Sequence, residues 1–225
     1  MGFDIDGKIL GFVFDMDGVL LDSESVYEEA WRVVAKEMGL KDIDLVHRKC
    51  LGRSEEDVHQ IMKMAYGETF DSNFFWNRTS DWSMDFMNEK GVPVKIGTFE
   101  FLDFLISRNI RMSVATSSSE SFAGKLLKRA GLLKYFETVV YGNEVQHSKP
   151  HPEIYSCACR KLGLEPFECV AVEDSPNGIK SADAAGLKCA MIPDRIMADE
   201  EMKNMSWKIF ESFVEMKSFF ESRGR

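Results

Sequence analysis

The stretch GFVFDMDGVLLDSE, residues 11–24, carries an apolar segment that ends abruptly in two carboxylates. Its first residues are apolar at successive positions, which is typical of a strand covered on both faces. Asp15 and Asp17 follow at once, and Gly18 allows a sharp backbone turn beside them. A buried strand that stops at two acidic residues predicts that both carboxylates lie at the rim of a sheet.

Short apolar segments of the same kind recur along the chain, each ending at a polar or glycine-containing turn. They cover residues 9–15, 110–116, 136–142, 168–174 and 188–193. Between them lie segments with helical start and stop signals, at residues 119–131, 151–163 and 175–186. Strands that alternate with helices predict an α/β fold, a Rossmann-like parallel sheet with helices on both faces.

One long segment departs from this alternation. About ninety residues after the first strand contain no clear strand, but residues 24–38, 54–67 and 71–91 have helical character. We therefore expect a small all-helical cap domain at residues 22–95, inserted after the first strand. The α/β core would then comprise residues 1–21 and 96–225, with residues 206–225 as a helix that packs on the sheet.

Polar residues follow the predicted strands at the points where ligands bind in doubly wound sheets, beyond the carboxyl ends. Carboxylate oxygens at such a rim favour a hard cation such as Mg²⁺, and a lysine with hydroxyl groups suits phosphate oxygens. In chain order these residues are Asp15, Asp17, Thr116, Ser117, Lys149, Glu173 and Asp174. The pattern predicts a cation site beside an anion site.

A carboxylate can also attack phosphorus and form an aspartyl-phosphate. Asp15 is placed for this role, because it follows the strand directly. Asp17, two residues further on, could protonate the leaving oxygen and later activate water. Gly18 lets the backbone pass close to a phosphate group.

Four motifs resemble the signature of the haloacid dehalogenase-like (HAD) superfamily: DMDGVLLDSE (15–24), ATSSS (115–119), SKPHPEIY (148–155) and VEDSPNGIKSADAAG (172–186). The resemblance covers residues 9 to about 194. It is strongest to the beta-phosphoglucomutase-like phosphatases, which carry a small helical cap after the first motif. The haloacid dehalogenases themselves lack the second aspartate, so Asp17 favours phosphoryl transfer.

The resemblance implies a role for each motif residue. Asp15 would be the nucleophile and a Mg²⁺ ligand, and Asp17 the general acid and base, with its backbone carbonyl on the metal. Thr116 and Ser117 would bind the phosphoryl group, and Lys149 would stabilise its charge. Asp174 would be a metal ligand, and Glu173 would either bind the metal or support its ligands.

The cap residues expected to face the substrate are Glu24, Tyr27, Gly52 and Arg53. Sugar-phosphate mutases of the family carry a histidine at the position of Tyr27 and an arginine at the position of Glu55. Both differ here, which favours a Mg²⁺-dependent phosphatase of small phosphorylated metabolites. A beta-phosphoglucomutase-type hexose phosphate mutase is the alternative. A non-enzymatic phospho-acceptor or binding domain is a third, disfavoured by Asp17 and the predicted cap.

The bulk composition limits the partners. The 225 residues carry a formal net charge of −9, which disfavours binding to a nucleic-acid backbone. The absence of an apolar run of about 18 residues disfavours a membrane span. We expect a cytoplasmic protein, a monomer or weak dimer, whose partner is a small phosphorylated metabolite. The pattern does not name that metabolite.

Overall fold

The chain forms two compact units. The computed structural model describes residues 3–4, 8–51 and 55–223. One unit combines Met1–Leu21 with Val94–Arg225, and the other is Asp22–Pro93. The sequence places the second boundary two residues later, at residue 95. We call them the α/β unit and the helical unit, and describe each by itself.

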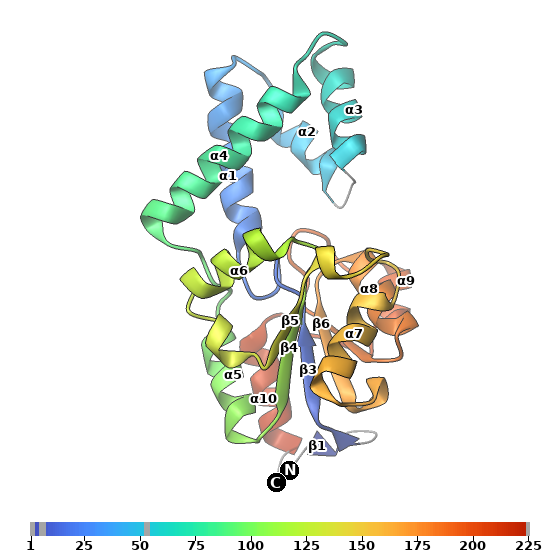
Figure 1. Ribbon diagram of the computed structural model, residues 1–225. Coiled ribbons are helices and arrows are strands. Elements are labelled where there is room, and N and C mark those ends of the chain that lie inside the picture. The colour runs from blue at the N-terminus through green and yellow to red at the C-terminus, as the bar shows by residue number, and fades with distance from the viewer. Residues whose placement is uncertain (1–2, 5–7, 52–54, 224–225) are drawn as a thin grey trace. The chain divides into compact units, whose positions relative to one another are not determined.

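A parallel sheet of six strands forms the centre of the α/β unit (Figure 1). Its order is β5-β4-β3-β6-β7-β8, and every neighbouring pair is parallel. The predicted α/β fold is confirmed, with one strand more than expected. The strands are β3 (Gly11–Phe14), β4 (Arg111–Ala115), β5 (Thr138–Val140), β6 (Cys169–Glu173), β7 (Lys188–Met191) and β8 (Lys208–Ile209).

Helices cover both faces of this sheet, with α5 and α10 on one side and α7 and α8 on the other (Figure 1). Phe12 of β3 packs with Phe101 of α5 and Phe220 of α10, at ring distances of 5.6 and 5.2 Å. Val13, which points to the opposite face, lies in the core cluster that contains Ile154 of α7. The helices are α5 (Thr98–Ser107), α6 (Glu120–Arg129), α7 (Glu153–Leu162), α8 (Pro176–Ala184), α9 (Glu200–Met205) and α10 (Phe213–Arg223), with 3-10 turns at Leu133–Tyr135, Gly142–Glu144 and Pro166–Glu168.

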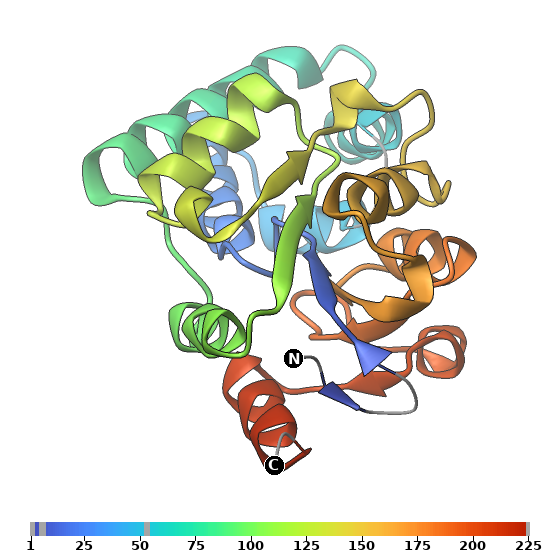
Figure 2. The ribbon, with the colours of Figure 1, turned by 60° about the horizontal axis from the view of Figure 1, so that its bottom comes forward.

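The first apolar segment is divided between two sheets. β1 (Phe3–Asp4) and β2 (Lys8–Ile9) form a separate antiparallel pair, and the parallel strand begins only at Gly11. Phe3 packs on Phe220 at a ring distance of 4.9 Å, so β1 lies beside α10 (Figure 2). This small pair covers the end of the sheet opposite to the carboxyl ends.

The helical unit contains α1 (Ser23–Glu37), α2 (Ile43–Cys50), α3 (Glu55–Tyr66) and α4 (Ser72–Lys90). Trp31 of α1 and Phe75 of α4 meet edge to face at 5.0 Å in the middle of its core. The second helix was not predicted, because only two of its eight residues, Val46 and Cys50, are buried. The expected all-helical character of this segment agrees with the structure.

Within the described part of the chain, no helix is both long enough and apolar enough to cross a membrane. The cytoplasmic location expected from the sequence stays a prediction.

Candidate active site

Asp15 lies at the carboxyl end of β3, a central strand of the sheet, at the point where the strand order reverses. β3 pairs with β4 on one side and with β6 on the other. The backbone N–H of Asp15 donates to the carbonyl of Val172 at 2.9 Å, which fixes Asp15 level with the end of β6. This is the point of a doubly wound sheet where ligands bind.

Lys149 reaches this point from the loop between the turn Gly142–Glu144 and α7. Its Nζ lies 2.5 Å from Oδ1 of Asp15, 2.6 Å from Oε1 of Glu173 and 3.1 Å from the carbonyl of Ala115. The three N–H groups of the ammonium therefore each have an acceptor. Only 7% of the side chain is exposed, so the interaction takes place largely away from water.

Glu173 is fully buried at the end of β6 and accepts hydrogen bonds on both oxygens. Oε1 accepts from Lys149 and, at 2.6 Å, from the hydroxyl of Tyr155 on α7. Oε2 accepts from the backbone N–H of Asp174 at 3.1 Å and from the hydroxyl of Ser175 at 3.1 Å. Glu173 thus holds Lys149 in place and aligns the start of the next loop.

Asp17 and Thr116 are joined through one residue that the sequence did not single out. The hydroxyl of Ser118 donates to Oδ2 of Asp17 at 3.2 Å. The backbone N–H of Ser118 donates to Oγ1 of Thr116 at 3.1 Å. The serine run was the available signal, because three serines follow Thr116 directly.

Two glycines allow the carboxylates to approach the backbone. Gly18 has a φ of +77°, and a Cβ there would lie 2.3 Å from Oδ2 of Asp174. A Cβ at Gly178, in the first turn of α8, would lie 1.9 Å from Cδ of Glu173. Both distances are shorter than any allowed contact, so each position requires glycine.

Two carboxyl groups of the site, those of Asp15 and Asp174, have raised pKa values. Burial raises the pKa of Asp15 to about 8; Glu173 and Asp17 add to the increase, and Lys149 opposes it. Burial also raises the pKa of Asp174 to about 9, and the charges of Glu173, Asp15 and Asp194 contribute. Burial alone would lower the pKa of Lys149, but Asp15 and Glu173 raise it above its ordinary value.

Comparisons with known proteins agree with this geometry. The family model of the haloacid dehalogenase-like hydrolases matches residues 12–192. The chain belongs to the haloacid dehalogenase-like hydrolase family.

Relatives within this family are named phosphatases. A phosphorylated carbohydrates phosphatase of Thermotoga maritima is 34% identical over 176 residues, covering 78% of this chain and 81% of the relative. A fructose-1-phosphate phosphatase of Escherichia coli is 29% identical, and the match covers 80% of this chain and 94% of the relative. A Thermotoga maritima crystal structure assigned as a beta-phosphoglucomutase has a TM-score of 0.81 at 28% identity, covering 95% and 99% of the two chains. The protein is an enzyme, a phosphatase of the haloacid dehalogenase-like family.

The acidic cluster of this phosphatase fits a divalent metal ion. Asp15, Glu173 and Asp174 each offer a carboxylate oxygen, and these three atoms lie within 4.8 Å of one another. Burial first, and then the neighbouring carboxylates, raise the pKa values of Asp15 and Asp174, and a bound cation would favour their ionised forms. Since both oxygens of Glu173 already accept hydrogen bonds, Asp15 and Asp174 are better placed as direct ligands.

The predicted site residues are divided between the two units. The α/β unit brings together Asp15, Asp17, Gly18, Thr116, Lys149, Glu173 and Asp174, and Ser117 lies exposed beside Thr116. Glu24 and Tyr27 lie half-buried in the first turns of α1, in the helical unit. Gly52 and Arg53 lie outside the described residues. Tyr155 belongs to the motif at residues 148–155, but the sequence indicates no role for it, because a tyrosine inside an amphipathic helix has no distinguishing signal.

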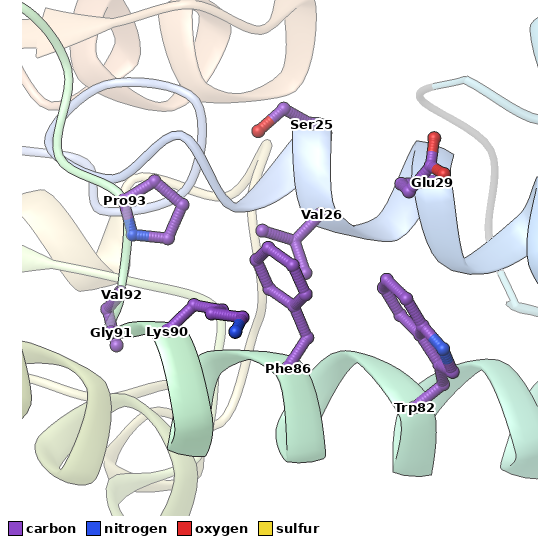
Figure 3. A pocket seen from close by; sticks show the side chains of 9 residues that line it. All are labelled: Ser25, Val26, Glu29, Trp82, Phe86, Lys90, Gly91, Val92 and Pro93. Carbon is purple, nitrogen blue, oxygen red and sulfur yellow. The ribbon is translucent and has the colours of Figure 1, made fainter.

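A separate groove of about 360 Å³ lies within the helical unit, between α1 and α4 (Figure 3). Trp82 and Phe86 of α4 stack at 5.3 Å and point toward Val26 of α1. Glu29 and Lys90 contribute charged groups to its lining. None of the residues predicted for the active site lines this groove, so we do not include it in the candidate site.

Proposed function

We propose that this protein is a Mg²⁺-dependent phosphatase of small phosphorylated metabolites such as sugar or polyol phosphates, acting through an aspartyl-phosphate. The observation that carries the proposal is the contact of Lys149 with Asp15 at the carboxyl end of β3, beside Asp174. A buried ammonium held against a carboxylate can neutralise phosphoryl oxygens at that carboxylate. The substrates in the names of the relatives support a small phosphorylated compound.

In the first step, one oxygen of Asp15 attacks phosphorus. A bond forms between this oxygen and phosphorus while the bond from phosphorus to the leaving alcohol oxygen breaks. Asp17 donates its proton to the leaving oxygen, so the alcohol departs neutral. The hydroxyl of Ser118 holds the carboxylate of Asp17 in a fixed orientation for this transfer.

In the second step, Asp17 accepts a proton from water, whose oxygen attacks phosphorus. The bond from phosphorus to Asp15 breaks, inorganic phosphate is released, and Asp17 again carries its proton. Lys149 faces the charge that develops on the phosphoryl oxygens in both steps. Thr116 is placed beside Ser118 to contact the same oxygens.

We propose that Asp15, Asp174 and the backbone carbonyl of Asp17 hold the Mg²⁺ ion. When bound, the ion supplies positive charge that keeps Asp15 ionised and offsets the charge of the phosphate. Glu173 then serves as the positioning residue for Lys149 and for the loop that starts at Asp174.

We further propose that residues 22–93 act as the cap and contribute Glu24, Tyr27 and Arg53 to substrate selection. Caps of this kind exclude water when they close over a site. Tyr27 stands where mutases of the family carry a histidine, and the relatives above are named phosphatases, so hydrolysis is favoured over the mutase alternative.

Phosphate release from a panel of sugar and polyol phosphates, with and without Mg²⁺, tests this proposal. The wild type is compared with Asp15→Asn, Asp17→Asn and, as a matched control, Asp81→Asn, whose side chain is exposed on α4. We expect Mg²⁺-dependent release in the wild type and in Asp81→Asn, and its loss in the other two variants. Asp15→Asn with wild-type turnover would overturn the nucleophile assignment. Conversion of a hexose 1-phosphate to its 6-phosphate without phosphate release would establish the mutase instead.

A further inference from the structure

A second group of metal-ligating side chains lies in the loop that carries Lys149. His147, His151 and Glu153 each offer one ligand atom, and the three atoms lie within 4.8 Å of one another. Nδ1 of His147 lies 3.0 Å and Nδ1 of His151 lies 3.9 Å from the same oxygen, Oε2 of Glu153. The imidazole side chains are 59% and 49% exposed, so an ion from solution reaches them without any opening of the fold.

The loop that presents these groups is held in shape by its own hydrogen bonds. The backbone N–H groups of Gln146 and His147 donate to the two oxygens of Glu153, each at 3.0 Å. The hydroxyl of Ser181 on α8 donates to the carbonyl of His151 at 2.6 Å. The two imidazole rings lie in contact, with their centroids 4.4 Å apart and their planes tilted by 33°. A ligand set fixed in advance loses little conformational entropy when an ion binds.

The donor set has the composition that transition-metal dications prefer. Two imidazole nitrogens and one carboxylate oxygen occur in zinc and other first-row metal sites, with water at the remaining positions. Ligand atoms at tetrahedral zinc lie about 3.3 Å apart, given bonds of about 2.0–2.1 Å. The two distances from Nδ1 to Oε2 of Glu153, 3.0 and 3.9 Å, lie on either side of that value.

We propose that His147, His151 and Glu153 form a second metal site, which binds a zinc-type dication independently of the site at the strand ends. The ion takes the place of the hydrogen bond between Nδ1 of His147 and Oε2 of Glu153. It also replaces the long hydrogen bond, 3.3 Å, from the backbone N–H of Glu153 to Nδ1 of His151.

The site differs in chemistry from the carboxylate cluster around Asp15. The latter offers oxygen ligands only, which suit Mg²⁺, whereas imidazole ligands favour zinc, copper or nickel. Thiols are weak competitors for zinc here, because four of the five cysteines are buried and Cys157 is half-buried on α7. Saturating Mg²⁺ should therefore occupy the carboxylate cluster, so that Zn²⁺ binding at the histidines can be measured by itself.

Isothermal titration of Zn²⁺ into the full chain in saturating Mg²⁺ tests the proposal. The variants are His147→Gln and His151→Gln, which leave the carboxylate that holds the loop intact. Ser148→Ala is the matched control, because Ser148 is exposed in the same loop. Asp174→Asn checks that the zinc ion does not occupy the strand-end cluster.

We expect one Zn²⁺ per chain in the wild type, Ser148→Ala and Asp174→Asn. Each histidine variant should bind Zn²⁺ at least tenfold more weakly, and Cu²⁺ bound to the wild type should show coupling to two nitrogens in its paramagnetic resonance spectrum. Zinc binding that survives both histidine substitutions, or that disappears in Asp174→Asn, would overturn the proposal. So would a wild type that binds no Zn²⁺. None of these outcomes depends on phosphatase activity.

Discussion

The hydroxyl of Tyr155 and the ammonium of Lys149 donate to the same oxygen, Oε1 of Glu173, each at 2.6 Å. The ammonium also lies 5.0 Å from the centre of the Tyr155 ring. Tyr155 is fully buried and therefore supports both the carboxylate and the lysine that this carboxylate positions. A buried residue of α7 thus helps to position the lysine.

Tyr155→Phe removes this hydroxyl and little else. Loss of one hydrogen bond to a charged group should lower the free energy of unfolding by about 2 kcal/mol. We expect kcat to fall about tenfold with KM nearly unchanged, because supporting residues around a site act on orientation rather than on binding. Urea unfolding and steady-state kinetics measure both effects. Tyr66→Phe, whose hydroxyl donates only to the Lys41 carbonyl, is the control and should keep wild-type kcat.

Lys149→Met removes the cation that faces the buried carboxylates. Breaking a buried ion pair on one side typically costs about 3–5 kcal/mol, so the metal-free variant should unfold at clearly lower urea concentration. Activity should fall about 10²–10³-fold, since developing phosphoryl charge loses its partner. Lys63→Met, on an exposed lysine of α3, should change neither quantity. Equal stability of Lys149→Met and wild type without metal would contradict the ion-pair network.

The raised pKa values of Asp15 and Asp174 predict how stability depends on pH without metal. Both carboxyls bind a proton more tightly in the folded than in the unfolded chain, where their pKa is about 4. Their contribution to stability is fully present below about pH 4. It is lost as pH rises through the folded values of about 8 and about 9.

Mg²⁺ should reverse this trend, because it binds the ionised carboxylates. The increase in Tm on adding Mg²⁺ is therefore expected to be larger at pH 9 than at pH 6. In Asp174→Asn, the pH slope of the metal-free protein should become shallower by up to about 1.4 kcal/mol per pH unit within that window. Thermal unfolding across this range gives both results. An increase in Tm that shrinks with rising pH would refute the assignment of these two residues.

Gly178→Ala has two opposing effects on stability, a gain from helix propensity and a loss from overpacking. Alanine is favoured over glycine inside a helix by about 1 kcal/mol. The added Cβ would stand 1.9 Å from Cδ of Glu173, however, and overpacking typically costs about 1–3 kcal/mol. We expect a net loss of stability, with a fall in kcat as Glu173 moves. In Gly124→Ala on α6, the nearest atom is the Tyr141 hydroxyl oxygen at 3.3 Å, and stability should equal that of the wild type or exceed it by up to about 1 kcal/mol.

The sequence allowed the parallel sheet and the strand-end residues to be predicted because these features are local. An apolar segment followed by acidic or hydroxyl residues is visible without knowledge of the fold. The sixth strand is different, since residues 206–225 have the apolar spacing of a helix. β8 forms because Trp207 and Phe210 donate backbone hydrogen bonds of 2.8 Å to Cys189 and Met191 at the edge of the sheet. The partner strand determines this structure, so no local pattern indicates it.

The supporting residues of the site escaped prediction for a related reason. Ser118 and Tyr155 act through contacts with Asp17 and Glu173, which lie 101 and 18 positions away in the chain. A hydroxyl on a loop and a tyrosine on a helix are common, and only the fold brings each beside a carboxylate. Residues that carry the chemistry have a recognisable pattern, whereas the residues that orient them have none.

The chain enters and leaves the helical unit at adjacent points. Leu20 accepts a backbone hydrogen bond from Lys95 at 3.0 Å, and Pro93 accepts one from Asp22 at 3.0 Å. A segment of more than seventy residues therefore begins and ends within one short ladder. In such an arrangement the inserted segment is an interchangeable module: another insert with neighbouring ends could replace it without altering the strand order that holds Asp15, Lys149 and Asp174. New substrate preferences could then arise by exchange of a whole cassette, while the chemistry of the sheet stays the same.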